Sequence, residues 1–75
     1  MRLNELQINQ EAIIKEILVE DKNLNLRLQE LGLYKKSKIK ILFYSPLKQT
    51  LLIKIFNSAF ALKLNIASKI LVEKV

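Results

Sequence analysis

Lys38-Ile39-Lys40-Ile41-Leu42-Phe43, residues 38–43, carries the clearest structural signal in this chain of 75 residues. Apolar side chains at alternate positions are typical of a strand that buries one face and turns the other toward water. The pattern therefore predicts a strand in which Ile39, Ile41 and Phe43 point into a core.

The same alternation returns downstream and predicts three further strands, over residues 51–55, 60–64 and 70–72. Pro46 interrupts the preceding strand, since proline lacks the N–H that a ladder needs, and residues 46–50 are expected to form a loop. Asn57-Ser58 is predicted to be a two-residue turn because Asn tolerates positive φ. Residues 65–68 are predicted to form a tight turn, with a single turn of helix as the alternative.

Upstream of residue 38, the sequence predicts a short helix over residues 22–31. Its apolar residues recur at i, i+4 and i+7 and form one stripe: Leu24, Leu28 and Leu31. Asp21 or Asn23 can cap the first turn, and Gly32 is expected to end the helix at positive φ. In such an ending Leu33 contacts Leu28.

Residues 11–20 are ambiguous. Ile13, Ile14, Ile17 and Leu18 have helical spacing, yet the segment is rich in the β-branched residues that favour strands. A strand with a bulge between Ile14 and Ile17 would give the same three-residue step. Periodicity alone leaves both structures open.

The composition argues against several function classes. The chain has neither Cys nor His, so it lacks thiol chemistry, the commonest metal ligand and the usual general base. Glu16 and Glu20 on a strand would lie about 13 Å apart, too far to share one ion. No Gly-rich phosphate loop and no Ser beside a base is present. We expect no enzyme activity, no cofactor and no metal site.

The charge is unevenly distributed along the chain. Residues 1–30 carry four basic and six acidic side chains, whereas residues 31–75 carry nine basic and one acidic. The basic half suits an acidic partner, a nucleic acid or an anionic membrane, and lysine as a plain solubilising residue explains it equally. No apolar run is long enough to span a bilayer, and no signal-peptide pattern opens the chain. We expect one cytoplasmic domain over residues 1–75.

The order of these features resembles the FeoA family, ferrous iron transport protein A. The matching segments, in chain order, are Leu3-x-x-Leu6, Arg27-Leu28-x-Glu30-Leu31-Gly32-Leu33, Pro46-Leu47, Ala61-Leu62-Lys63, Ala67 and Ile70-x-Val72. Together they cover essentially the whole chain at the family's spacing.

The resemblance implies a mainly β fold, a small SH3-like barrel of about five strands with one short helix between strands one and two. It thereby resolves residues 11–20 as a strand. The chain departs from the family at turns where glycine is usual, such as Asn9-Gln10 and Lys36-Ser37; Asn9 accepts positive φ more readily than Lys36. For function, the resemblance implies an accessory role beside FeoB, the membrane ferrous iron transporter with a cytoplasmic GTPase domain.

We predict that this partner contacts the helix, its exit and the loop after the second strand. The set combines an Arg, an aromatic and apolar side chains, which are common in binding hot spots: Arg27, Leu33, Tyr34, Lys35, Lys36, Pro46 and Leu47. A second candidate surface is the opposite strand phase, either an apolar patch or residues covered by the helix: Leu42, Tyr44, Leu52, Phe56 and Leu71.

Two other functions are weighed against this one. A basic barrel that binds nucleic acid needs exposed aromatics between basic side chains, and only Tyr34 and Tyr44 look available. An iron-linked regulatory module resembles the C-terminal domain of iron-dependent repressors, which follows a helix-turn-helix region not recognised here. In the preferred prediction the protein binds no nucleic acid and reaches the membrane only through its partner. A homo-oligomer is compatible with this prediction.

Overall fold

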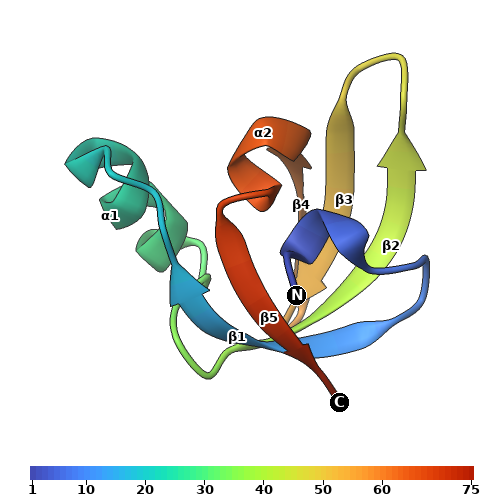
Figure 1. The fold of residues 1–75 in the computed structure, drawn as a ribbon, viewed down its shortest axis with the longest axis horizontal. Coiled ribbons are helices and arrows are strands. Elements are labelled where there is room, and N and C mark those ends of the chain that lie inside the picture. The colour runs from blue at the N-terminus through green and yellow to red at the C-terminus, as the bar shows by residue number, and fades with distance from the viewer.

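The computed structural model describes residues 1–75 and contains one antiparallel sheet of five strands in the order β4-β3-β2-β1-β5 (Figure 1). The elements in chain order are η1 (Leu3–Glu5), β1 (Glu11–Ile17), α1 (Lys22–Glu30), β2 (Lys38–Ser45), β3 (Thr50–Ile55), β4 (Ser58–Lys63), α2 (Leu64–Ala67) and β5 (Ile70–Lys74). The predicted mainly β fold, with one short helix between the first two strands, is confirmed. Two single-turn helices, η1 and α2, accompany it, and α2 joins the two edge strands β4 and β5.

The core is one cluster of 16 buried apolar residues to which all five strands contribute. In β3 the alternation is as predicted, because Leu51, Ile53 and Ile55 are fully buried while Lys54 is exposed. Burying each such side chain stabilises the fold by about 1.5–3 kcal/mol. These contacts fix which face of the sheet is inside.

The prediction that Phe43 of β2 points into the core is wrong. Ile39 and Ile41 are buried, but Phe43 is 55% exposed. A bulge shifts the β2–β3 register between Ile41 and Phe43, and a single extra residue moves the following side chains to the other face. Tyr44 consequently pairs with buried Leu51 and packs against the core. Its hydroxyl donates a hydrogen bond to the Asn4 carbonyl at 3.4 Å.

In β1 the strand interpretation of residues 11–20 is confirmed, although the strand ends at Ile17. The predicted irregularity is present, since the pairing of β1 with β5 shifts between Ile14 and Glu16. Ala12 and Ile14 are buried, whereas Ile13 is 40% and Leu18 46% exposed. The bulge explains why apolar residues follow a three-residue step on a strand.

The turn between β3 and β4 lies one residue earlier than predicted. Ile55 pairs directly with Ser58, so the two turn residues are Phe56 and Asn57. Phe56, rather than Asn57, has positive φ, at 55°. A first turn position with positive φ is usually occupied by glycine, so a bulky aromatic residue there is an outlier.

Candidate functional site

The end of α1 is fixed by a complete set of backbone hydrogen bonds. Gly32 has φ 96° and its N–H donates to the Gln29 carbonyl at 3.0 Å. The Leu33 N–H donates to the Leu28 carbonyl at 2.8 Å, so both bonds of a Schellman ending are made. At the other end of the helix the Asp21 carboxylate accepts from the Asn23 and Leu24 N–H groups. The predicted cap and the predicted role of Gly32 are confirmed.

The helix exit, residues Gly32–Ser37, is a closely bonded loop. Buried Ser37 donates its hydroxyl to the Gly32 carbonyl at 2.8 Å and its N–H to the Tyr34 carbonyl at 3.1 Å. The Lys36 N–H donates to the Ile14 carbonyl at 2.8 Å, and the Ile14 N–H donates to the Ser37 carbonyl at 2.9 Å. Lys36 has φ 74°, a conformation that these bonds stabilise. The backbone that carries the exposed side chains of this loop is therefore ordered.

Four of the predicted contact residues are exposed at this end: Arg27, Tyr34, Lys35 and Lys36. Tyr34 is 45% exposed, so nearly half of its surface is open to solvent. Leu33 differs from the other predicted contact residues, because it is fully buried and belongs to the core cluster. It can support the surface from below but cannot touch a partner.

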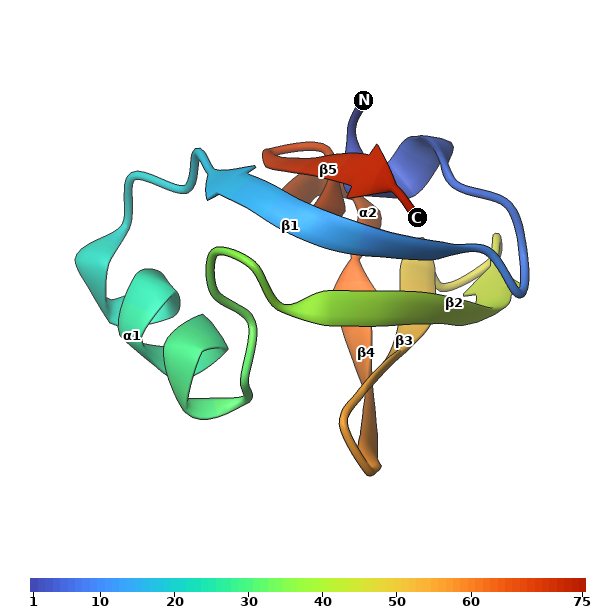
Figure 2. The same cartoon turned by 90° about the horizontal axis from the view of Figure 1, so that it is seen from below.

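Pro46 and Leu47 lie away from the helix exit. The eight residues of β2 separate the two segments, and a strand of that length spans roughly 25 Å. Figures 1 and 2 both place α1 and the β2–β3 loop toward opposite ends of β2. Leu47 is 98% exposed and packs on nothing. The predicted site is thus split in two rather than forming one continuous patch.

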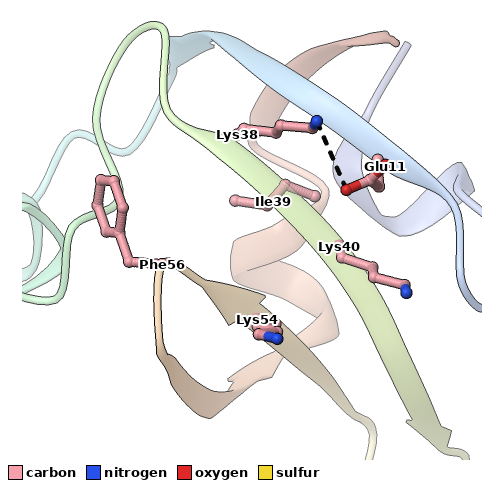
Figure 3. Close-up of a pocket in the computed structure, with 6 residues that line it drawn as sticks. All are labelled: Glu11, Lys38, Ile39, Lys40, Lys54 and Phe56. Carbon is pink, nitrogen blue, oxygen red and sulfur yellow. Dashed lines mark ion pairs between the residues drawn. The ribbon is translucent and has the colours of Figure 1, made fainter.

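A basic groove on the outer face of the sheet was missed by sequence reasoning. It is a hollow of about 360 Å³ lined by Glu11, Lys38, Ile39, Lys40, Lys54 and Phe56 (Figure 3). The Lys38 Nζ lies 3.7 Å from the Glu11 Oε2. The outward strand phase of the lysines was visible in the sequence, but the pairing of Lys40 with Lys54 depends on the β2–β3 register.

Gly32 connects the groove to the helix exit. A Cβ built on Gly32 would lie 3.1 Å from the Ile55 Cγ2 and 3.2 Å from the Phe56 Cε2. The absence of a side chain therefore lets the Phe56 ring lie against the end of α1. Gly32 serves two purposes, since it supplies positive φ for the helix ending and space for this ring.

The second candidate surface is only partly formed. Leu42, Leu52 and Leu71 are half-buried, Tyr44 packs on the core, and Phe56 is 66% exposed in the β3–β4 turn. Phe43, which pairs with Leu52 on the outer face, takes the place that Tyr44 was expected to hold.

No group of three His, Cys, Asp or Glu side chains is close enough to hold a metal ion. None of the helices has the length and apolar character needed to cross a bilayer. Neither the helix exit nor the groove contains a nucleophile paired with a base.

The comparison with protein families identifies one family. The model of the FeoA domain matches residues 1–74. The FeoA protein of Chlorobium tepidum superposes with a TM-score of 0.92 at 25% identity, over 100% of this chain and 70% of that one. Iron(II) transport protein A of Clostridium thermocellum superposes with a TM-score of 0.90 at 31% identity, over 100% of this chain and 46% of that one.

A third solved structure names the fold. FeoA of Stenotrophomonas maltophilia, complexed with zinc, superposes with a TM-score of 0.81 at 26% identity, over 97% of this chain and 89% of that one. It is described as a prokaryotic SH3 domain protein possibly acting as a bacterial ferrous iron transport activating factor. The SH3-like barrel expected for this chain is therefore confirmed. No curated protein sequence matches the chain.

Proposed function

This chain belongs to the FeoA family, which is associated with ferrous iron transport, and we propose that it binds a FeoB-type transporter through the cytoplasmic GTPase domain. The observation that carries the proposal is the family match over residues 1–74. The family comprises small transport accessory domains and is not an enzyme family. In this proposal the chain acts as one noncatalytic cytoplasmic domain and reaches the membrane only through its partner.

The helix exit is the surface that we propose for this contact. It presents Arg27 and Tyr34, two residue types enriched in binding hot spots, and the flanking Lys35 and Lys36. Its backbone is already ordered by the bonds of Ser37 and Lys36, so less conformational entropy is lost on binding. The cluster of positive charge favours an acidic surface on the partner and speeds the encounter.

Affinity for the isolated GTPase domain of the cognate transporter, measured by calorimetry, tests this proposal. We expect the Tyr34→Ala, Arg27→Ala double variant to bind at least about fivefold more weakly than the native chain, equivalent to a loss of about 1 kcal/mol. Lys48→Ala, which removes an exposed charge at the far end of β2, is the control and should bind like the native chain.

Thermal unfolding of each variant must accompany the affinities, because Tyr34 is partly buried. A native chain that fails to bind the GTPase domain would refute the proposed partner. A folded double variant with native affinity would refute the proposed surface.

A further inference from the structure

We propose that the basic groove is a second binding site, and that its ligand is an acidic polypeptide segment carrying apolar residues beside its carboxylates. The groove lies on the outer face of β1, β2 and β3 and is lined by Lys38, Lys40, Lys54, Glu11 and Phe56. The inference does not depend on the proposed transporter contact, because the ligand is defined by chemistry alone.

An unrelieved like-charge pair is the first observation. Lys40 and Lys54 are direct cross-strand partners of β2 and β3, so their side chains leave the same face of the sheet. Directly opposed residues have Cβ atoms about 4.5–5.5 Å apart, and like charges in this position destabilise a sheet. Neither lysine takes part in either of the two ion pairs of the molecule, Lys15–Glu73 and Lys38–Glu11. A carboxylate bound between them would remove this repulsion.

The only acidic group of the groove is already engaged. Glu11 is the direct cross-strand partner of Lys40, yet its carboxylate lies 3.7 Å from the Lys38 Nζ (Figure 3). Lys40 is half-buried, so water screens its charge less than it would at a fully exposed position. The groove thus retains two cations that have no carboxylate partner within the molecule, and another molecule can supply one.

Phe56 supplies an apolar contact at one end of the groove. Its ring is 66% exposed although it lies against Gly32, and its backbone has φ 55°. For an L-residue this conformation costs roughly 1–2 kcal/mol, which glycine at the same position would avoid. Such an outlier points toward a functional reason for the side chain. An exposed aromatic ring is a typical anchor for an apolar residue of a ligand.

The outer face continues in an apolar row on the other side of the lysines. Phe43 pairs with Leu52, and Leu52 pairs with Ala61, so these side chains share the face. Phe43 is 55% exposed. The surface therefore alternates apolar, basic and apolar along its length, which complements a segment in which carboxylates are flanked by apolar residues.

These features favour a polypeptide over a nucleic acid. A phosphate backbone binds through the number of phosphates that it neutralises, and here one of three cations is already paired with a carboxylate. Glu11 would also repel a neighbouring phosphate. Protein carboxylates can be spaced to avoid it, and their apolar neighbours can bury the exposed rings.

Fluorescence anisotropy with a short labelled peptide of alternating glutamate and leucine tests the proposal. The control ligands are the same peptide with glutamine in place of glutamate, and single-stranded oligothymidylate. The Lys40→Glu variant should bind the glutamate peptide at least about tenfold more weakly, a loss of about 1.4 kcal/mol. Lys48→Glu, the same charge change at an exposed lysine outside the groove, should stay within about twofold of the native chain.

The melting temperature provides a second and independent readout. Lys40→Glu replaces the repulsion with Lys54 by an attraction but adds a repulsion with Glu11, its partner on β1, so the melting temperature should stay close to that of the native chain. Lys54→Gln serves as a second variant, which should weaken peptide binding without introducing a negative charge. Equal binding of the glutamine peptide, equal losses in the two Glu variants, or tighter binding of oligothymidylate would each overturn the proposal.

Discussion

The two ends of β2 carry the two halves of the predicted partner site, and they are built very differently. At the start of the strand, the helix exit is held by the Schellman bonds, the Ser37 hydroxyl and two backbone bonds to Ile14. At the end of the strand, Gln49 donates its N–H and its side-chain amide to the Pro46 carbonyl, and its own carbonyl accepts one bond from the Leu64 N–H. Leu47 at the tip is 98% exposed.

The difference shows that exposure alone does not make a binding surface. The helix exit exposes Tyr34 and its neighbours on a backbone that buried Leu33 and Ser37 anchor in the core. The β2–β3 loop exposes Leu47 without any such anchor, and single exposed apolar residues are common on protein surfaces. Substitutions at the helix exit should therefore affect stability as well as binding, whereas those in the loop should affect neither.

Leu33→Ala should produce the largest effect on stability. Leu33 is fully buried in the core cluster, and truncating a buried leucine to alanine costs about 2–5 kcal/mol. For a domain of this size, much of the total free energy of unfolding would be lost. Urea denaturation followed by circular dichroism would measure it. A loss below about 1 kcal/mol would mean that the helix exit is not anchored as described.

Gly32→Val should produce the next largest effect, about 2 kcal/mol or more, because valine is strained at φ 96°. Its side chain would also crowd the Ile55 and Phe56 atoms that a Cβ approaches to 3.1 and 3.2 Å. Urea denaturation of Gly32→Val, Phe56→Ala and the double variant separates the two causes. Crowding predicts that the double variant loses less than the sum of the single losses, whereas pure φ strain predicts additive losses.

An unchanged midpoint for Gly32→Val would contradict both causes. Valine would then be tolerated both at φ 96° and beside the Phe56 ring.

Most of the fold follows from local sequence, and the exceptions share one cause. The alternation in β3, the Asp21 cap and the Gly32 ending are encoded by neighbouring residues, so periodicity and helix-ending rules predict them. Phe43 is misplaced because the bulge in β2 is set by pairing with β3, where Leu51 must stay inside. The β3–β4 turn is displaced for the same reason, since Ile55 pairs with Ser58 whatever the turn propensity of Asn57.

The site was less predictable than the fold. The contact of Leu33 with Leu28 was expected from the helix ending, and that contact already implied burial of Leu33. The groove could not be found, because Lys40 and Lys54 are distant in sequence and meet only through the strand register. Phe56 has positive φ in the β3–β4 turn, and its exposed ring lies beside these two lysines. Phenylalanine is unusual at positive φ, so the residue type gives no indication of this conformation.

Leu47→Ala should have the smallest effect and is the most direct test of the difference between the two ends of β2. The side chain is 98% exposed, so its removal should change the free energy of unfolding by less than about 0.5 kcal/mol. Affinity for the GTPase domain of the transporter should also stay within about twofold, since the loop lies roughly 25 Å along β2 from the helix exit. Calorimetry and urea denaturation of the same preparation measure both quantities. A clear loss of affinity with unchanged stability would show that the partner spans both ends of β2. One interface would then contain Arg27, Tyr34 and Leu47. The partner, rather than the core, would order the exposed β2–β3 loop.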